Sequence, residues 1–146
     1  MEIVRTLTAP CSPSALFVHV DDLDRYPPWM DLVHDVERLD DGPVWEVELR
    51  ATVGPFARSK RLRMRRTEHV VDRSVVFSRD ESDGRRHASW VLRADLRRLV
   101  DGTELTMRLT YGGSLWSGAV LQRVLDDKIE SGSRNLLELV SAAPRR

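Results

Sequence analysis

The feature that most constrains this chain is a long stretch of two-residue alternation, from about Val33 to Tyr111, interrupted by turn sequences. Such alternation predicts half-buried strands, because successive side chains of a strand point to opposite faces. The stretch is therefore predicted to form an antiparallel meander of six strands. The turn candidates are Gly54-Pro55-Phe56-Ala57, Asp83-Gly84, Asp101-Gly102 and, as a weaker one, Asp72-Arg73.

Each turn fixes a strand register, and a slip of one residue would invert both faces of a strand. All the facing pairs that follow are apolar, so three turns independently predict the same apolar sheet face. The predicted pairs are Leu49 with Leu62, Val47 with Met64, Phe77 with Trp90, Val75 with Leu92, Leu96 with Met107, Ala94 with Leu109, and Leu92 with Tyr111.

Other periodicities flank this sheet. Residues 2–8 are predicted as a first strand, and Ser12-Pro13 is typical of the start of a short helix. A second short helix is expected from Leu23 to Leu32. After Gly112-Gly113 the period becomes 3.6, which predicts a final helix of about 25 residues. Its apolar stripe is Leu121, Leu125, Ile129, Gly132, Leu136, Leu139 and Val140.

Gly132 lies in the middle of that stripe. A helical glycine costs about 1 kcal/mol relative to alanine, so a local reason for the missing side chain is expected. The two candidate reasons are a close approach to the sheet and room for a ligand.

Composition excludes several classes of protein. The 146 residues suit one domain, expected to span residues 1–146. The 23 Lys and Arg balance the 23 Asp and Glu, which argues against a globally basic nucleic-acid binder. The single cysteine, Cys11, precludes an internal disulfide and favours a cytoplasmic location, and an inert thiol is favoured over a reactive one. Neither a signal peptide nor a membrane-spanning run is recognisable.

The common catalytic and cofactor motifs are absent: HExxH, CxxC, GxSxG, Walker and GxGxxG patterns do not occur. His19, His34, His69 and His87 form no i, i+4 pair on a predicted helix. No metal site and no cofactor are therefore predicted.

Two charged segments have alternative interpretations. Six cations between Arg58 and Arg66 could face nucleic acid or phospholipid, but the register sets Glu48 opposite Arg63 and Glu46 opposite Arg65. Cross-strand pairing on a solvated face is therefore favoured. Residues 19–41 carry eight acids, which we interpret as solvated, capped short helices, with an acidic portal or partner contact as the alternative.

The apolar face carries an anomaly. Its phase brings Arg66 and Glu68 inward, and the Asp72-Arg73 turn sets Arg79 across from Arg66. Like charges do not face each other in a dry core, so either this end opens to water or Glu68 and an anionic ligand neutralise the pair. Arg66 also falls opposite Trp45, where a cation–π contact is possible.

The order of elements resembles the helix-grip fold of the START and birch-pollen-allergen-like superfamily (SRPBCC), and within it the bacterial polyketide cyclase/dehydratase-like members. The resemblance spans essentially the whole chain and implies an α+β fold. In it a curved antiparallel sheet of about seven strands wraps round a long C-terminal helix. Local matches are Leu23-Asp24-Arg25-Tyr26-Pro27-Pro28-Trp29, the hairpin Val53-Gly54-Pro55-Phe56, and the helix after Gly112-Gly113.

The resemblance implies binding of an apolar or amphipathic small molecule between sheet and helix, with catalysis in some members and none in others. Our first hypothesis is a pocket for a polyketide-, lipid- or quinone-like molecule, enlarged by Ala51, Ala88, Ala94 and Gly132. A cavity below about 100 Å³, against roughly 300 to 1,000 Å³ for usual ligand sites, would contradict it. The polar contacts would be Arg66, Glu68 and Tyr111. The full set is Trp45, Val47, Leu49, Leu62, Met64, Arg66, Phe77, Trp90, Leu92, Met107, Leu109, Tyr111, Leu125 and Ile129.

Two alternatives remain open. One is a polyketide cyclase/dehydratase with Glu68 as base and Arg66 as enolate stabiliser, which full activity in E68Q and R66M would eliminate. The other is a delivery module similar to carbon monoxide dehydrogenase accessory subunits, with Arg61, Arg63 and Arg65 facing anionic lipid. No nucleic-acid partner is expected, peripheral membrane contact is left open, and the sequence fixes no oligomeric state.

Overall fold

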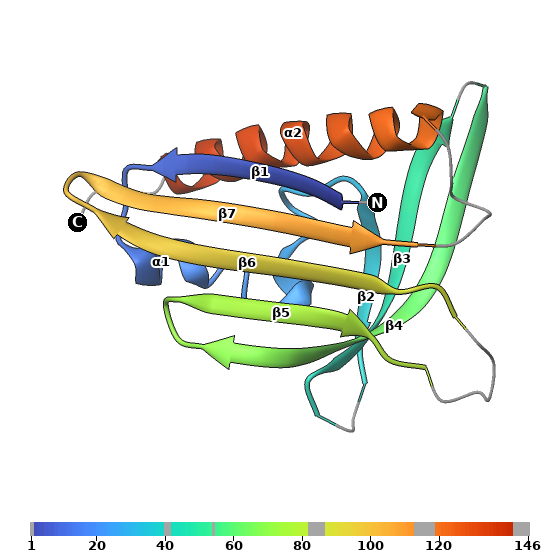
Figure 1. The fold of residues 1–146 in the computed structure, drawn as a ribbon, viewed down its shortest axis with the longest axis horizontal. Helices are drawn as coiled ribbons and strands as arrows, with labels where there is room; N and C mark the ends of the chain where they lie inside the picture. The colour runs from blue at the N-terminus through green and yellow to red at the C-terminus, as the bar shows by residue number, and fades with distance from the viewer. Residues whose placement is uncertain (1, 40–41, 54, 82–86, 113–118, 142–146) are drawn as a thin grey trace.

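Seven antiparallel strands and one long helix build most of the structure, a computed structural model that describes residues 2–39, 42–53, 55–81, 87–112 and 119–141 (Figure 1). The predicted order of one strand, two short helical segments, six strands and a final helix is confirmed, but the second short helix, expected from Leu23 to Leu32, is only a 3₁₀ turn over Leu23–Arg25. The elements are β1 (Glu2–Ala9), α1 (Pro13–Phe17), η1 (Leu23–Arg25), β2 (Val33–Arg38), β3 (Val44–Val53), β4 (Phe56–Val70), β5 (Ser74–Arg79), β6 (Trp90–Leu99), β7 (Gly102–Tyr111) and α2 (Ala119–Ser141).

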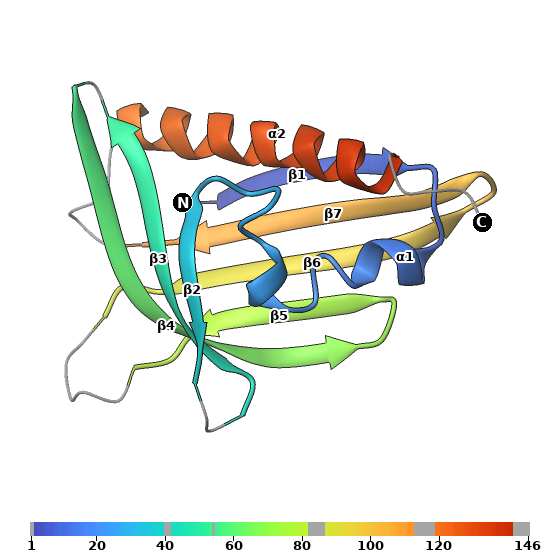
Figure 2. The ribbon, with the colours of Figure 1, turned by 180° about the vertical axis from the view of Figure 1, so that it is seen from behind.

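The sheet is a meander from β2 to β7, and β1 pairs with β7 to complete the order β1-β7-β6-β5-β4-β3-β2. It is strongly curved, and α2 runs alongside β1 and also contacts β3, so the helix lies across the opening between the two ends of the sheet (Figure 1). Figure 2 shows α1 and the segment around η1 on the concave side. Sheet, short helical segments and α2 thus enclose one interior.

The predicted sheet face is correct, but the predicted facing partners are wrong by two residues. Val53 pairs with Phe56, so the first loop has two residues where four were predicted. Leu99 pairs with Gly102, so the other two-residue loop is Val100-Asp101 and not the predicted Asp101-Gly102. A shift of two keeps every side chain on its predicted face. The turn at Asp83-Gly84 lies outside the described residues. The observed pairs include Val47 with Leu62, Trp45 with Met64, Phe77 with Leu92, Val75 with Ala94, Leu96 with Leu105, Ala94 with Met107, Leu92 with Leu109, and Trp90 with Tyr111.

A β-bulge in β4 is the second departure from the predicted pattern. The turn at Asp72 is confirmed, with φ of 63° at that residue. The register with β5 then shifts between Arg66 and Glu68, so Arg66 pairs with Phe77 and the predicted pairing of Arg66 with Arg79 is wrong. An extra residue bends its strand and inverts the alternation beyond it. β4 accordingly changes direction along its length (Figures 1 and 2).

Helix α2 packs through the predicted stripe, with Leu125 and Leu136 fully buried and Ile129 and Val140 nearly so. Leu139 is 39% exposed, so its assignment to the buried stripe is wrong, because it lies at the margin of the contact. The side chain of Leu121 lies outside the described residues. On the other side of the helix, Arg5 of β1 donates to the Asp126 carboxylate at 2.5 Å. The predicted helix and its buried face are confirmed.

The lack of a side chain at Gly132 is explained by a close approach to Met30. A Cβ there would lie 2.7 Å from Met30 Cε and 2.8 Å from Met30 Sδ. The close approach is thus to the segment that follows η1, not to the sheet. Asn135, one turn further on, donates from Nδ2 to the Trp29 carbonyl at 3.2 Å and fixes the same contact.

Gly102 gives a test of the packing between β1 and the β6–β7 hairpin. A Cβ at Gly102 would lie 2.2 Å from the Ala9 carbonyl oxygen, a backbone atom that cannot move aside. We expect Gly102→Ala to lower the free energy of unfolding by about 1 to 3 kcal/mol, measured by urea denaturation. Gly112→Ala is the control, since its Cβ would meet only Ser89 Oγ at 3.6 Å. Equal stability of the two variants would contradict the packing described here.

Candidate functional site: an apolar cavity between sheet and helices

An apolar cavity lies on the concave side of the sheet, and three separate parts of the chain build its wall. The strands β2, β3, β4, β6 and β7 supply most of it, α2 supplies one residue, and the segment from η1 to β2 supplies the remainder. The lining residues are Leu23, Tyr26, Met30, Leu32, Val33, Val47, Leu49, Leu62, Met64, Trp90, Leu92, Met107, Leu109 and Ile129.

Nine of the fourteen predicted contacts line this cavity: eight lie on β3, β4, β6 and β7, and the ninth, Ile129, lies on α2. The structure does not place Trp45, Arg66, Phe77, Tyr111 or Leu125 in the lining. Trp45, Phe77 and Leu125 are fully buried in the core beside it. They satisfy the predicted periodicity but pack against other side chains instead.

Sequence reasoning missed the five lining residues between Leu23 and Val33. Their apolar spacing predicted a short helix with a buried side, and that signal was available. The spacing does not predict where this segment lies. It lies across the concave face, where its side chains share the cavity with those of β3, β4 and β7. Tertiary packing determines that position.

The wall is uncharged and chemically inert. Its only hydroxyl belongs to Tyr26, which donates to the Val20 carbonyl at 2.8 Å. Burial, with a smaller contribution from Asp21 and Asp22, raises the pKa of Tyr26, so the phenol stays protonated. No lining residue can therefore exchange a proton near neutral pH. The arrangement favours contact with apolar groups over acid–base chemistry.

The cavity measures about 60 Å³. This volume is below the bound of about 100 Å³ stated above, so it contradicts the first hypothesis in its stated form, a ligand-sized cavity between sheet and helix. An engineered apolar cavity of about 150 Å³ admits benzene, so this one is too small for a single aromatic ring as it stands. The space between sheet and α2 is occupied by large side chains, among them Met30, Met64 and Met107. Met30 reaches this space because Gly132 has no side chain in its way.

The segment from Asp21 to Met30 is held against β4 by polar contacts. Arg66 Nη1 donates to the Asp21 carbonyl at 2.8 Å, and its guanidinium lies 5.8 Å from the Trp45 ring centroid. The predicted cation–π contact is confirmed, although it comes from diagonal neighbours. His69 Nε2 lies 3.1 Å from the Asp21 carboxylate, and its ring stacks on Phe17 at 5.5 Å. Arg66 and His69 thus fasten one wall of the cavity.

The predicted inward orientation of Glu68 is wrong. The bulge turns Glu68 to the outer face, where it accepts from Ser74 Oγ at 2.7 Å and pairs with Arg93 at 3.2 Å. His69 takes the inward position instead. Glu68 does not line the cavity and lies on the opposite face from Arg66, so a catalytic role of this pair stays a prediction without a shared site.

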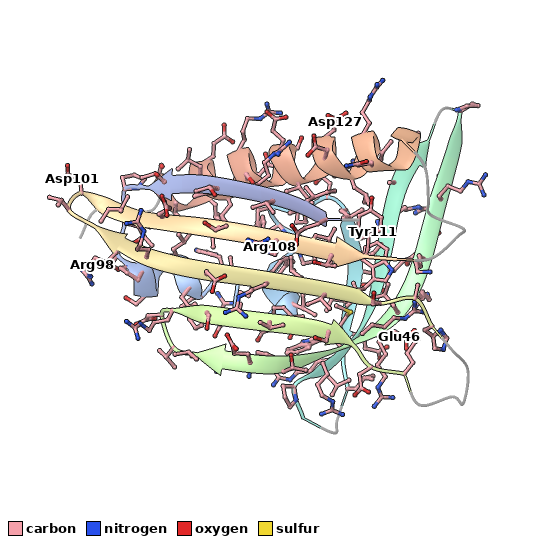
Figure 3. The ribbon with its side chains drawn as sticks, viewed as in Figure 1. Glu46, Arg98, Asp101, Arg108, Tyr111 and Asp127 are labelled. Atoms are coloured by element: carbon pink, nitrogen blue, oxygen red, sulfur yellow. The ribbon has the colours of Figure 1, made fainter. Side chains whose placement is uncertain are left out.

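Tyr111, the third predicted polar contact, is buried beside Trp90 with ring centroids 5.4 Å apart, and burial raises its pKa. It lies where β7 ends, at the end of the sheet opposite the hairpin that carries Arg98 and Asp101 (Figure 3). The aromatic pair of Trp90 and Tyr111 confirms that this end of the apolar face is filled by rings.

The basic strand is engaged in ion pairs on the outer face. Arg61 lies 2.9 Å from Glu46 and 3.5 Å from Glu48, and Arg65 lies 2.6 Å from Asp80. The predicted facing of Glu48 with Arg63 and of Glu46 with Arg65 is wrong by two residues, for the same reason as the other registers. The interpretation of a solvated, paired strand fits these contacts.

Acidic residues of the segment before β2 serve local structure. The Asp22 carboxylate accepts from the Asp24 backbone N–H at 3.0 Å as the N-cap of η1 and pairs with Arg38 at 3.5 Å. Asp24 has its pKa raised, chiefly by burial and then by Asp22. None of these carboxylates is in the cavity lining.

The described residues provide no evidence for a metal site, a reactive thiol or a membrane-spanning helix. Within the described ranges no group of three or more His, Cys, Asp or Glu side chains is placed to hold a metal ion. Burial raises the pKa of the Cys11 thiol, which disfavours the reactive thiolate. No helix in this part of the chain is long and apolar enough to cross a membrane.

Arg66 allows the fastening of the cavity wall to be tested. We expect Arg66→Met to lower the free energy of unfolding by about 1.5 to 3 kcal/mol, because a charge-assisted hydrogen bond to the Asp21 carbonyl is lost. Amide hydrogen exchange from Leu23 to Met30 should accelerate with it. The matched control is Arg58→Met at an exposed position of the same strand, expected to change stability by less than about 0.5 kcal/mol. Unchanged exchange in R66M would contradict this role.

The sequence matches a family model over residues 9–137, described as "Polyketide cyclase / dehydrase and lipid transport". Curated proteins provide no match to the sequence.

Solved structures share the fold over nearly the whole chain. A conserved protein from Geobacillus kaustophilus superimposes with a TM-score of 0.76 at 11% identity, covering 97% of this chain and 95% of that one. A START superfamily protein from Mycobacterium smegmatis gives 0.72 at 16% identity, with 96% and 97% covered. Ara h 8.0201 gives 0.65 at 13% identity, with 98% and 99% covered. At these identities the similarity establishes the helix-grip fold.

Proposed function

The chain belongs to the polyketide cyclase / dehydrase and lipid transport family, and we propose that it binds a small apolar or aromatic molecule between the sheet, the η1 segment and α2. One observation carries this proposal: a cavity on the concave side whose lining is apolar throughout and comes from three separate parts of the chain. Sites for small molecules are concave and lined mainly by hydrophobic and aromatic side chains. The family description is compatible with such a ligand.

The cavity has to expand to admit this ligand, and its lining supports a way to do so. Met30, Met64 and Met107 are unbranched, with three rotatable bonds each, so they can repack at low cost. Every 100 Å² of apolar surface that a ligand buries contributes about 2.5 kcal/mol. A molecule of two fused rings therefore gains several kcal/mol, which offsets the rearrangement of flexible side chains.

The geometry supports binding better than the two alternatives. Catalysis needs an acid or base within reach of the ligand, and the lining has none that titrates near neutral pH. Delivery to anionic membranes through the basic strand requires cations that are free to contact lipid, whereas Arg61 and Arg65, although exposed, already pair with carboxylates. Binding requires only the apolar wall that is present.

Titration with 1-naphthol, followed in ¹⁵N–¹H NMR spectra, tests this proposal. We expect saturable shifts of amides that line the cavity, with a dissociation constant below about 1 mM. Leu109→Trp should abolish the shifts by filling the cavity, whereas Leu139→Trp, at an exposed position of α2, should leave them unchanged. Thermal unfolding of both variants checks that they fold. Absence of saturable shifts in the wild type, or identical shifts in L109W, would contradict binding at this site.

A further inference from the structure

Charged side chains interrupt the apolar inner face of the sheet directly beside the cavity. Lys60 pairs in register with Leu49, and Arg79 pairs with Met64, so each cation has a cavity-lining residue as its neighbour across the strands. Trp90, which also lines the cavity, begins the strand on the other side of β5. Ser78 pairs with Val91 and Trp90 pairs with Tyr111, so Arg79 borders the cavity at the end of the sheet where Tyr111 lies (Figure 3).

Arg79 is held rigidly in this position. Its Nε donates to Glu81 Oε2 at 2.6 Å, its Nη1 donates to the Ala88 carbonyl at 3.2 Å, and its Nη2 lies 3.1 Å from His87 Nδ1. The side chain is only 8% exposed. These three contacts use one N–H from each nitrogen, whereas a guanidinium has five N–H donors. Donors thus remain on an arginine whose orientation is already fixed.

Lys60 adds a second positive charge to this group. Its side chain is half-buried, and within the described residues it makes no hydrogen bond or ion pair. Burial and then the charge of Arg79 lower the pKa of Lys60, while Glu81 acts in the opposite direction. Lys60 lies on the same face of β4 as Met64, the partner of Arg79, and the direction of the pKa shift accords with that placement.

The charges of this group do not balance. Among the described residues of this group, Lys60 and Arg79 contribute two positive charges and Glu81 one negative charge, with His87 beside them. A half-buried excess of positive charge next to an apolar wall is unfavourable until an anion neutralises it. The cavity wall itself offers no such anion, because it is uncharged.

We propose that Lys60 and Arg79 form a subsite for the carboxylate of an amphipathic ligand whose apolar body occupies the cavity. This inference rests on the proposed function, and it names the class of ligand: a small apolar or aromatic carboxylic acid. The fixed guanidinium supplies directed N–H donors, and the flexible lysine supplies a point charge. One carboxylate compensates the single excess positive charge, whereas a phosphate dianion would leave an excess of negative charge beside Glu81.

Two probes of nearly equal shape test the subsite: 2-naphthoic acid, which is an anion at pH 7, and 2-acetylnaphthalene, which is neutral. Their dissociation constants are measured by isothermal titration calorimetry at low ionic strength, where half-exposed charges are least screened. We expect the acid to bind the wild type about tenfold more tightly than the ketone. The preference should disappear in Lys60→Met and in Lys60→Gln, with the affinity for the ketone retained. Lys128→Met on α2 is the matched control and should keep the preference.

The outcomes separate this subsite from the proposed function. Equal affinity of the wild type for both probes would overturn the carboxylate subsite and leave apolar binding intact. A preference that persists in both folded Lys60 variants would also overturn it. If neither probe binds, the proposed function fails and the subsite with it. Thermal unfolding of each variant confirms that the compared proteins are folded.

Discussion

One extra residue in β4 determines much of this structure. The bulge between Arg66 and Glu68 belongs to β4, the strand that bends in Figure 1, and a bulge of this kind bends its strand so that the sheet can curve around an interior. It also exchanges the faces of the residues beyond it. Glu68 goes outward to Arg93 and Ser74, whereas His69 goes inward to Asp21 and Phe17. Without that exchange a carboxylate would lie where an aromatic ring now supports the cavity wall.

The same bulge marks the limit of what the sequence can predict. Alternation identified the inner face of the strands correctly even though the partners were wrong by two residues, because an error of two preserves the face. A bulge inverts the face after a single residue, and nothing in Arg66-Thr67-Glu68 distinguishes it from regular strand. Nine predicted lining residues survive because they lie before the bulge or on other elements. Glu68 lies just beyond it and does not.

The remaining wall of the cavity depends on contacts between parts of the chain that are far apart. The segment from Leu23 to Leu32 was predicted as a helix with an apolar side, but its place is set by the hydrogen bonds of Arg66 to Asp21 and of Asn135 to Trp29. Periodicity reports which side of a segment is buried and contains no information about its partner. The volume of the cavity is even harder to predict from sequence. It is a small difference between two large volumes: the space that the backbone encloses and the space that the side chains fill.

Met30 connects that volume to the final helix. A glycine in the middle of α2 costs about 1 kcal/mol of helix propensity, and in return the Met30 side chain reaches into the interior where an alanine Cβ would meet it. The cavity is therefore small because a flexible side chain occupies space that the backbone leaves open. A ligand bound as proposed would displace this side chain and not a strand or a helix, so the scaffold and Arg79 would keep their geometry. The rigid sheet thus determines the shape of the cavity, and the flexible methionine side chains allow that cavity to change its volume.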